Sequence, residues 1–491
     1  MIKFLRGEEE FVRLGMKFGL VPVVAETPAA RRSASEIFRA LKEGGFAFLA
    51  EGDGRDVHEG RYSVIGLSPL RTFSMESDAD DRGGSFLRVM RGYVEGAEAF
   101  RDPMLPPFSG GLFGYFGFEA AAVFEGMPCD FGLKKPLEAA SFFAPGVVAV
   151  LDRVRDALLI VCYVETRGKA ERELKEMYRV SYRRLVTLYR RLSLHGASSR
   201  SLRPRPLAPV VSREAFMERV SASIEAIKRG EAGQIVVSQR FEGEAPEDPI
   251  ALYEALRREN PSPFHFYFES PGVTLIGASP EVLARVRNGR VELRPLAGTR
   301  RRGSTPAEDA ALEAELKADP KEREEHILLV ELAKEDAAKT CLPSSVAVTE
   351  YMEVERFARV MHIVSQVEGD LRPGMHALDA FRASFPAGTV SGAPRRRAME
   401  IIAEVEGEPR NSYAGAFCAL DYDGDLDSCI AIRTFSISAG RLHLQVGAGV
   451  VADSNPAVEY QETMHKADAL FRALAGGTEP ERGRAIDVKV G

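Results

Sequence analysis

A series of short strand-like runs joined by glycine-containing turns constrains the fold more than any other feature of this sequence. Asn288-Gly289 separates two of these runs, and this dipeptide is typical of a two-residue hairpin turn. Hairpins outnumber strand–helix–strand units along the chain, which favours antiparallel sheets flanked by helices over a parallel, doubly wound sheet. The strands predicted after residue 212 are 234–241, 263–269, 273–277, 283–287, 290–294, 414–422, 429–438 and 441–448.

Composition and patterning divide the chain into four parts. Residues 1–192 mix strands and helices, and we interpret them as a regulatory region that also contributes strands to the sheets. Residues 193–211 are small, basic and proline-containing, which is typical of a linker. Residues 212–475 form the candidate catalytic region, and 476–491 form a tail. The first part has predicted strands at 45–50, 61–65, 110–115, 146–152 and 157–164, and predicted helices at 34–42 and 170–192.

Charge and cysteine usage narrow the class of protein. A formal net charge of −7 argues against nucleic acid or an anionic membrane as the partner. The five cysteines form no Cys-x-x-Cys pair, which favours a reduced, cytoplasmic protein with buried thiols. The N-terminus lacks the apolar core of a signal peptide, and the longest apolar run, 157–164, is too short to span a bilayer. No phosphate-loop, dinucleotide-binding or zincin motif is present.

The segment 447–466 joins glycines to a helix that carries opposite charges. We expect Gly447 and Gly449 to form a turn whose backbone amides can approach an anion closely. The helix that follows places Glu459, Glu462 and Lys466 on one face. Two carboxylates and an ammonium beside such a turn indicate a site for a charged ligand.

A second predicted helix, 321–332, carries a matching pair of carboxylates. Glu322 and Glu325 are three residues apart and share one face. Two helices of this kind can jointly hold Mg²⁺, which prefers oxygen ligands and keeps several of its waters. Either helix alone is more simply explained as a solvated surface helix, because such pairs are common.

A set of motifs, in a fixed order, identifies a family. They include Ile235-Val-Val-Ser-Gln-Arg-Phe241, Gly277-Ala-Ser-Pro-Glu281, 260–263, 294–300, 360–365, 385–394, 431–434 and 447–466, with weaker matches at 60–66 and 110–115. The set resembles the chorismate-utilising enzymes, most closely the large subunits of anthranilate synthases, and is nearly continuous from about 215 to 475. The resemblance implies an α+β fold of two packed, mostly antiparallel β-sheets with flanking helices. Residues 212–475 would then be the chorismate-binding region.

The resemblance also implies a magnesium site and catalytic groups. Glu325 and Glu462 match the family's Mg²⁺ ligands. Glu322 and Glu459 lie near them in sequence, where they could bind through water or protonate the departing hydroxyl as a general acid. His362 matches the active-site histidine, which we expect to move a proton during the loss of pyruvate.

Further positions match the family's contacts to chorismate, which carries two carboxylates. Arg433 matches the arginine on the enolpyruvyl carboxylate, where a rigid guanidinium suits a planar anion. Lys466 matches a lysine near the carboxylates, whereas we expect His326 and His465 to be structural. The other implied substrate positions are Gln234, Ala297, Gly298, Thr299, Thr389, Tyr413, Gly447, Ala448 and Gly449.

Two positions indicate the branch of the family. Isochorismate-forming members place a lysine at the position of Gln234 to activate water, and a glutamine has no basic nitrogen for this task. Aminodeoxychorismate synthases commonly carry a nucleophilic lysine at the position of Ala297. With both lysines absent, the implied nucleophile is ammonia, added at C2, and elimination of pyruvate then yields anthranilate, the first step of tryptophan biosynthesis.

The ammonia is expected to come from a separate glutamine amidotransferase subunit, because no cysteine sits in a Gly-x-Cys-x-Gly setting. Three alternatives remain open at this point. The enzyme could stop at 2-amino-2-deoxyisochorismate, or it could make 4-amino-4-deoxychorismate without the lysine. The chain could also be a catalytically silent sensor of chorismate or tryptophan, although the carboxylate pairs argue against this.

The sequence departs from the family pattern in two regions. The family's Asp-Leu-Ala-Arg-Asn-Asp-Leu-Gly-Arg becomes Glu331-Leu-Ala-Lys-Glu-Asp-Ala-Ala-Lys339, a change that could affect the site wall or partner docking. The implied tryptophan pocket has Gly52 in place of a serine and His265 in place of a methionine, so we predict weak or absent inhibition by tryptophan. The implied pocket comprises Glu51, Gly52, Arg61, Tyr62, Ser63, Pro261, Ser262, Pro263, Phe264 and His265.

Overall fold

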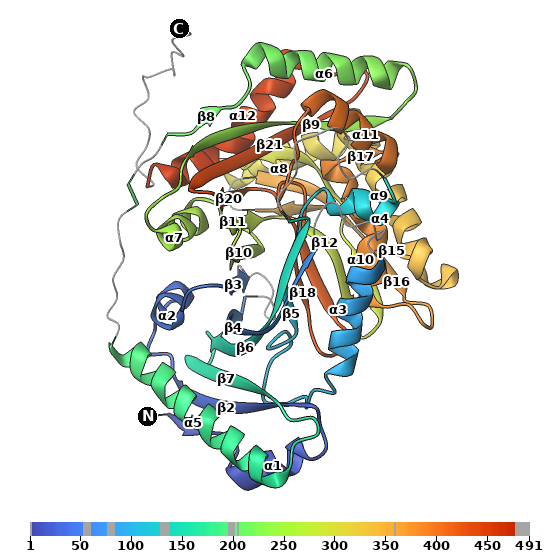
Figure 1. Ribbon diagram of the computed structural model, residues 1–491. Helices are drawn as coiled ribbons and strands as arrows, with labels where there is room; N and C mark the ends of the chain where they lie inside the picture. Colours follow the sequence, from blue (N-terminus) through green and yellow to red (C-terminus); the bar gives the residue numbers. More distant parts are fainter. Residues whose placement is uncertain are drawn as a thin grey trace.

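The computed structural model describes residues 2–52, 60–75, 84–127, 138–194, 202–203, 206–357 and 360–476. Antiparallel pairing joins the 21 strands of these residues into one network (Figure 1). The strands are β1 Lys3–Phe4, β2 Leu20–Pro28, β3 Ala47–Gly52, β4 Tyr62–Met75, β5 Leu112–Phe116, β6 Ala140–Asp152, β7 Ala157–Glu165, β8 Ala208–Pro209, β9 Gln234–Glu244, β10 Phe264–Glu269, β11 Thr274–Ser279, β12 Val282–Arg287, β13 Arg290–Leu293, β14 Leu296–Arg301, β15 Ala347–Arg356, β16 Val360–Asp370, β17 Gly392–Ala393, β18 Ala416–Leu420, β19 Leu426–Ile430, β20 Thr434–Ser438 and β21 Arg441–Val450.

The network divides into two branches at β6. One branch runs from β6 through β4, β3, β10, β11, β20 and β21 to β9. The other runs through β5, β18, β19, β12 and β13 to β16, which also pairs with β14 and β15. Each branch therefore begins with strands of the N-terminal part and continues with strands of the C-terminal part, because β3 pairs with β10 and β5 pairs with β18.

Aromatic side chains fill the space between the two branches. The rings of Phe48 on β3 and Phe113 on β5 stack with centroids 4.0 Å apart. Phe266 on β10 stacks in the same way on Phe417 of β18, at 4.7 Å. These rings belong to one buried cluster, and offset stacking adds to the energy of their burial. The prediction of two packed, antiparallel sheets with outer helices is confirmed by this arrangement.

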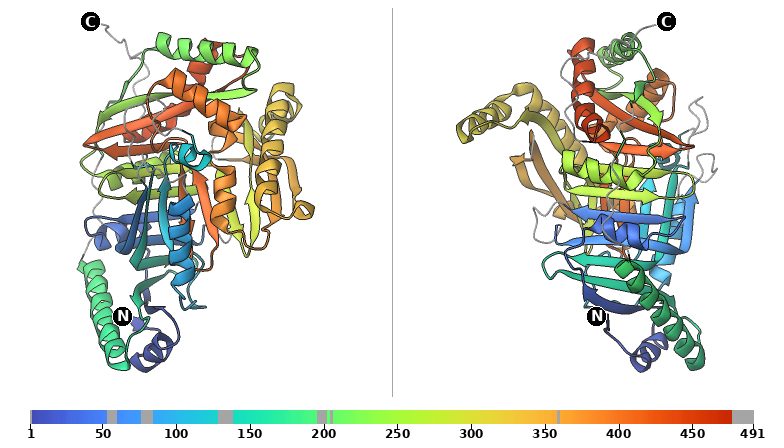
Figure 2. Two further views of the ribbon diagram at one scale, coloured as in Figure 1. Left: turned by 45° about the vertical axis from the view of Figure 1, so that its right-hand side comes forward. Right: turned by 90° about the vertical axis from the view of Figure 1, so that its left-hand side faces the viewer.

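Helices cover the outer faces of the branches, with α1 and α5 at the end near the N-terminus and α6 and α12 at the opposite end (Figures 1 and 2). None of the described helices has the length and apolar character that a membrane crossing requires. The helices are α1 Glu8–Gly15, α2 Ala34–Leu41, α3 Gly84–Gly96, α4 Ala120–Glu125, α5 Glu171–Leu194, α6 Arg213–Lys228, α7 Pro249–Glu259, α8 Pro306–Ala318, α9 Pro320–Thr340, α10 Ala377–Ser384, α11 Arg395–Glu406 and α12 Pro456–Leu474, with 3₁₀ turns η1 Pro343–Ser345 and η2 Gly388–Val390.

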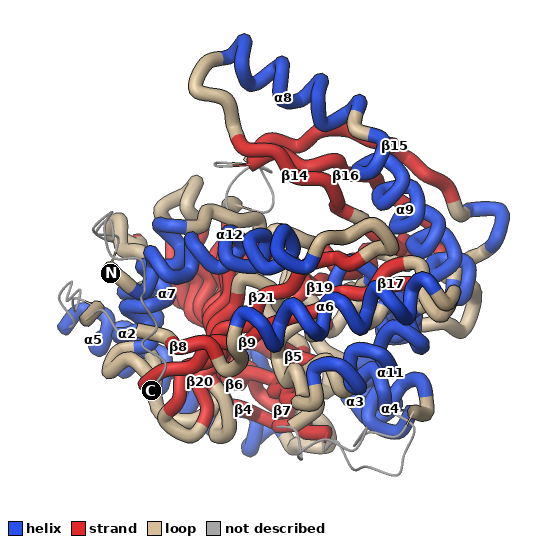
Figure 3. Tube along the Cα trace, turned by 90° about the horizontal axis from the view of Figure 1, so that it is seen from above, coloured by secondary structure: helices blue, strands red, loops and turns tan. Residues whose placement is uncertain are grey.

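The two acidic helices begin at well-defined caps. The Asp319 side chain accepts hydrogen bonds from the first backbone amides of α9, and Asn455 caps α12 in the same way. Proline follows each cap and suits the first helical turn. Figure 3 shows α12 over β21 and β9, with α9 alongside β14 and β16 in a neighbouring part of the molecule. The caps therefore fix the first residue of each helix, and with it the positions of the carboxylates along both helices.

One strand prediction is wrong in an informative way. The pattern predicted a single strand over 429–438, but β19 ends at Ile430 and β20 begins at Thr434. Arg433, in the break, has a φ of +49°, a left-handed conformation that costs roughly 1–3 kcal/mol in a residue other than glycine. The break lets β19 join one branch and β20 the other. Tertiary packing overrides the local preference for a continuous strand.

The boundaries predicted between the parts of the chain remain predictions. Helix α5 extends to Leu194, and β8, which pairs with β9, lies within the predicted linker 193–211. Residues 195–201 and 204–205 of that linker, and 477–491 of the predicted tail, lie outside the described residues.

Candidate active site

The carboxylate of Glu325 forms the centre of the candidate site. Gln234, at the start of β9, donates a hydrogen bond from Nε2 to Glu325 Oε1 at 2.9 Å. Burial raises the pKa of Glu325, and the neighbouring carboxylates of Glu322 and Glu462 raise it further. Lys466 and Gln234 oppose this shift. A partly buried carboxylate with acidic neighbours on two helices is the environment in which a cation would be stabilised.

Helix α12 contributes the second group of charges. Lys466 Nζ lies 2.7 Å from Glu462 Oε1 and donates a hydrogen bond to the Gly447 carbonyl at 3.0 Å. Glu459 is 3% exposed, its Oε2 has no hydrogen-bond partner, and burial raises its pKa. The predicted face of Glu459, Glu462 and Lys466 therefore lies at the same place as Glu325.

The glycines before α12 have a different role from the one predicted. Gly447 and Gly449 are residues of β21 that pair with β9, so the prediction of a glycine turn here is wrong. A Cβ atom at 447 would lie 2.6 Å from Tyr413 Oη, and one at 449 would lie 2.8 Å from Gln234 Nε2 and 3.6 Å from Glu325 Oε1. These positions require glycine because of the close approach of functional side chains. Ala448, between them, is buried.

His362, on β16, presents an unpartnered nitrogen. Its Nδ1 lies 3.0 Å from the Gly298 carbonyl and 3.1 Å from Thr299 Oγ1. The carbonyl can only accept, so Nδ1 carries the proton and buried Nε2, which has no partner, offers a lone pair. Burial lowers the pKa of His362 to about 3, and the cations of Arg433 and Lys466 act in the same direction. The ring is therefore a neutral acceptor at physiological pH.

A bulge in β14 supports this histidine. The pairing of β14 with β16 shifts between Ala297 and Thr299, and Gly298 has a φ of +66°, which favours glycine. A Cβ on Gly298 would lie 3.3 Å from Glu322 Oε2. Glu322 itself accepts a hydrogen bond from Arg300 Nη1 at 2.9 Å. The bulge thus places the residues that contact His362, Gly298 and Thr299, next to Glu322 of α9.

Arg433 and Glu281 form a second charged group at the site. Arg433 is desolvated, which lowers its pKa, and the carboxyl of Glu281 is close enough to oppose that shift. Arg433 Nη1 donates a hydrogen bond to Asn260 Oδ1 at 3.3 Å. Thr389, in the turn η2, donates one to Glu281 Oε1 at 2.8 Å. Burial raises the pKa of Glu281 to about 8, so this side chain is largely protonated at neutral pH.

Glu281 was not among the predicted catalytic residues. It closes the motif 277–281, which was used only to identify the family. Its neighbours in sequence show no carboxylate pair on a helix face, which is the pattern that selected the other acidic residues. Only the burial and the approach of Thr389, Arg433 and Lys466 distinguish it.

No group of three or more histidine, cysteine, aspartate or glutamate side chains is close enough to hold a metal ion by itself, within the residues that the structure describes. The donors that the site offers are carboxylate oxygens from α9 and α12, whose electrostatic influence on one another is evident in the raised pKa of Glu325. Hard oxygen donors of this kind fit Mg²⁺, which needs few protein ligands when a substrate and water complete its shell.

The predicted effector pocket lies where β3, β4 and β10 pair. Glu51, on β3, is buried and accepts hydrogen bonds from Tyr253 Oη at 2.6 Å and Ser63 Oγ at 3.2 Å. Arg153 forms an ion pair with the same carboxylate, and Arg257 Nε lies 3.6 Å from it. The predicted residues Gly52 and Ser63 are strand neighbours of Glu51, which is therefore heavily engaged by protein groups.

The other predicted effector residues divide between two surroundings. Arg61 stacks on the Tyr62 ring and forms an ion pair with Asp152 at 2.7 Å rather than contacting Glu51. His265, paired with Glu51 in the sheet, lies 3.1 Å through Nε2 from the carbonyl of Asn260, the residue that also contacts Arg433. Ser262 has a buried, unpartnered hydroxyl. Pro263 and Phe264 line a cavity of about 490 Å³ together with Glu281. The remaining member of the predicted pocket is Pro261.

The divergent segment 331–339 of α9 lies mostly on the outside. Lys334 pairs with Glu331 at the surface, and Glu335 is exposed. Lys339 is exposed and bonds to Asp336, which is buried against Arg395. The charged substitutions in this segment therefore lie at or near the surface, whereas Ala337, where the family has leucine, is buried in the core. An effect on the site wall or on partner docking stays a prediction.

Comparison with known proteins identifies the family. The family described as chorismate binding enzyme matches residues 47–472. The chain therefore belongs to the chorismate binding enzyme family.

The names of individual relatives describe a narrower activity than the family name does. The chain is 37% identical to anthranilate synthase component 1 of Bacillus caldotenax, over 95% of this chain and 96% of that one. It is 41% identical to the protein of the same name from Streptomyces coelicolor, over 84% and 81%. Among solved structures, anthranilate synthase component I from Streptococcus pneumoniae is 32% identical with a TM-score of 0.72, covering 84% of this chain and 92% of that one. The menaquinone-specific isochorismate synthase of Escherichia coli shares the fold, with a TM-score of 0.73 at 20% identity over 95% and 98%.

Proposed function

We propose that this protein aminates chorismate at C2 with ammonia and then eliminates pyruvate to form anthranilate. The observation that carries the proposal is the convergence of Gln234 on Glu325 at 2.9 Å. Isochorismate formation would need a base at this position to activate water, and a glutamine amide cannot supply one. Ala297, next to the bulge, likewise offers no nucleophile. The relatives from Bacillus caldotenax and Streptomyces coelicolor are both named anthranilate synthase component 1, which supports the same reaction.

The charges of the site suit a dianionic substrate. Arg433 is desolvated, and its guanidinium could bind one carboxylate in a bidentate manner. Lys466, beside Gly447, would lie near the negative charge at the other end. Tyr413 and the glycine strand would close the site around the enolpyruvyl group, because side chains at 447 and 449 would occupy this space.

Glu281 is our proposed proton donor for the hydroxyl that leaves C4. Its pKa of about 8 keeps it protonated at neutral pH, and Thr389 holds one of its oxygens. Glu322 is less suited to this task, because it is ion-paired with Arg300. His362 Nε2 is our proposed acceptor for the proton removed from C2 when pyruvate is lost, since this nitrogen is neutral, buried and unpartnered.

We propose Mg²⁺ as the cofactor, held by Glu325 and Glu462 and approached by Glu322 and Glu459. When bound, the ion would neutralise the ring carboxylate of chorismate and orient it. Gln234 would keep Glu325 in place, because its amide holds one carboxylate oxygen. The unpartnered Glu459 Oε2 could accept a hydrogen bond from a water of the ion.

The ammonia is proposed to come from a separate glutamine amidotransferase subunit. The relatives carry the name component 1, and the sequence has no cysteine in a nucleophile-like glycine setting. The cysteines in the described parts of the chain are buried, as expected for structural thiols.

The test uses the purified chain with chorismate, Mg²⁺ and excess ammonium at alkaline pH, followed by mass spectrometry. Anthranilate with an equimolar amount of pyruvate is the expected result. An amino-chorismate without pyruvate would instead identify a 2-amino-2-deoxyisochorismate synthase or a 4-amino-4-deoxychorismate synthase. Unchanged chorismate, even with a glutaminase partner added, would favour a silent sensor.

A further inference from the structure

A buried arginine, Arg410, contacts the backbone and ring of residues at or next to three predicted substrate positions, Gln234, Thr389 and Tyr413. Its side chain is 1% exposed, and it lies in the loop between α11 and β18. A buried guanidinium is costly unless nearly all of its N–H groups are bonded. The partners of Arg410 therefore show which elements of the fold this side chain holds together.

Arg410 is anchored by one buried carboxylate. Nε donates to Glu406 Oε2 at 2.9 Å, and Nη2 donates to Glu406 Oε1 at 2.6 Å, so the pair is bidentate. Glu406 also accepts hydrogen bonds from the backbone amide and the hydroxyl of Ser238 on β9, both at 2.8 Å. The anchor thus ties the loop to the strand that carries Gln234.

The remaining N–H groups of Arg410 reach two backbone carbonyls beside predicted substrate contacts. Nη2 donates to the carbonyl of Val236 at 2.6 Å, on β9 two residues after Gln234. Nη1 donates to the carbonyl of Val390 at 2.8 Å, next to Thr389. The guanidinium also lies 5.5 Å from the centroid of the Tyr413 ring. Three elements that face the substrate site therefore converge on one side chain.

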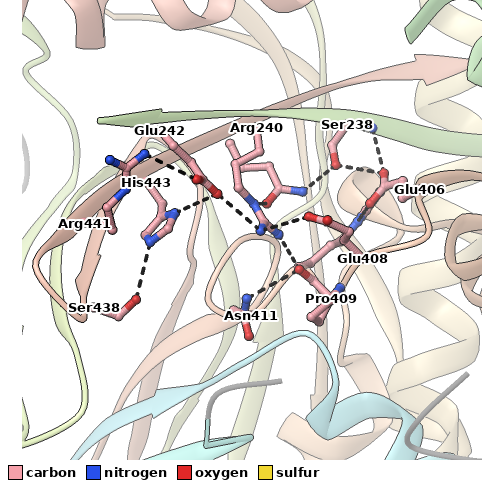
Figure 4. A network of polar contacts seen from close by, with 12 residues as sticks. Ser238, Arg240, Glu242, Glu406, Glu408, Pro409, Asn411, Ser438, Arg441 and His443 are labelled. Atoms are coloured by element: carbon pink, nitrogen blue, oxygen red, sulfur yellow. Dashed lines mark hydrogen bonds and ion pairs between the residues drawn. The ribbon is translucent and has the colours of Figure 1, made fainter. Parts of the chain in front are cut away.

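Figure 4 shows that Glu406 belongs to a wider network of polar contacts, which includes Ser238, Arg240 and Glu408. Gln445 donates to Ser238 Oγ at 2.7 Å and accepts from Arg240 Nε at 3.3 Å. Arg240 also bonds to the Pro409 carbonyl and lines a cavity of about 400 Å³ with Glu242 and His443. Arg240 belongs to the same loop network, but its hydrogen bonds and ion pairs are with Gln445, Glu408, Pro409 and Glu242 instead of Val236, Val390 and Tyr413.

We infer that Arg410 is a positioning residue for the reaction: it fixes β9, the turn η2 and Tyr413 relative to one another, and so sets the geometry in which Gln234, Thr389 and Tyr413 meet chorismate. The inference rests on the proposed function of this site. A lysine could not replace it, because an ammonium cannot hold a carboxylate bidentately and two carbonyls at once. A displacement of about 1 Å in such a frame can reduce the rate by about a hundredfold.

The test compares Arg410→Lys with Arg240→Lys, a matched substitution in the same network. We expect Arg410→Lys to raise the KM for chorismate by about tenfold or more and to lower kcat, whereas Arg240→Lys should change either constant by less than about threefold. Thermal unfolding of both variants is measured in parallel. A purely structural role would lower the melting temperature of Arg410→Lys while leaving its KM and kcat at the wild-type values, and this result would overturn the inference.

A second variant covers the case in which Arg410→Lys does not fold. The double substitution Arg410→Met and Glu406→Leu removes both buried charges together, which is often tolerated by the fold. This variant should fold and yet bind chorismate at least about tenfold more weakly in calorimetry, because the carbonyls of Val236 and Val390 lose their shared donor. Wild-type affinity would overturn the inference. Absence of chorismate binding to the wild-type chain would instead reject the proposed function, and with it the inference.

Discussion

The candidate active site and the predicted effector pocket are both built around buried carboxylates, yet they treat those carboxylates differently. In the effector pocket, Glu51 is engaged by Tyr253, Ser63 and Arg153. At the active site, Glu459 Oε2 and His362 Nε2 are buried without a partner. A buried polar atom that the protein leaves unpartnered indicates where a ligand is expected. The contrast between the carboxylates supports a ligand at the active site, whereas in the pocket the unpartnered group is the hydroxyl of Ser262.

The two regions are nevertheless connected. Asn260 accepts a hydrogen bond from Arg433 through its side chain, and its carbonyl lies 3.1 Å from His265 in the pocket. A molecule that displaced His265 could therefore reach the proposed carboxylate-binding arginine through one residue. Substitutions in each region test whether the carboxylates of the two regions differ in function as they differ in partners.

The largest effect is expected for Glu325→Gln. Loss of a charge that faces the proposed cation should lower kcat by about 10³-fold, the upper range for removal of one preorganised electrostatic contact. Steady-state kinetics over a titration of Mg²⁺ gives the measurement. Activity within a factor of ten of wild type, with an unchanged Mg²⁺ requirement, would contradict the role of this side chain.

Glu281→Gln should lower kcat by about 10²–10³-fold, because a glutamine cannot donate a proton to the leaving hydroxyl as an acid. In the wild type, the pKa of about 8 means that the active, protonated form is lost as the pH rises through 8. The kcat/KM value, corrected for the concentration of free ammonia, should therefore fall above pH 8. A profile without this alkaline limb would show that Glu281 does not titrate in the reaction.

Glu51→Gln should affect stability and leave the chemistry intact. The change weakens the contacts with Arg153 and Tyr253, which should lower the free energy of unfolding by about 1–3 kcal/mol. Urea denaturation measures this loss, and kcat should stay within about twofold of wild type because Glu51 lies in the other region. A hundredfold loss of kcat in a folded variant would abolish the distinction between the two carboxylate groups.

Gly52→Ser tests the missing hydroxyl of the effector pocket. One new hydrogen bond to tryptophan should tighten its binding by about 3–10-fold from a weak starting affinity. The chain contains no tryptophan, so the indole fluorescence of the ligand can be followed without a protein background. Micromolar binding to the wild-type chain would refute the prediction of a weakened pocket.

The smallest effect is expected in the divergent segment of α9. Restoring the family pattern with Lys334→Arg, Glu335→Asn and Lys339→Arg should change stability by less than about 0.5 kcal/mol and leave ammonia-dependent kcat unchanged, because these side chains lie outside the site. The same assay with glutamine and a glutaminase subunit would reveal an effect on docking. A clear change in the ammonia-dependent rate would show that this segment influences the site after all.

Much of the fold followed from local patterns. The Asn288-Gly289 turn lies between β12 and β13 as predicted. The helix faces of Glu322 with Glu325 and of Glu459 with Glu462 were predicted from spacing alone, because helical geometry fixes which residues share a face. Motif order identified the family, which the comparisons confirm.

The strands that the pattern misplaced show what local sequence leaves open. Residues 431–433 read as strand, but they form a break in which Arg433 has a left-handed backbone. Gly447 was expected in a turn, but it lies in β21. A glycine is needed there because Tyr413 occupies the space that a side chain at 447 would fill. Both features are set by neighbours that are distant in sequence.

The sequence by itself determined the elements, the acidic helix faces and the family, because these depend on short-range periodicity and on motifs. Only the tertiary structure decided that Glu281 is a buried, protonated acid and that Arg410 joins three elements beneath the site. It also decided that the β6 strand divides the sheet into two branches. The burial and the pKa of a side chain depend on contacts with residues that are distant in sequence, and these contacts cannot be inferred from spacing along the chain.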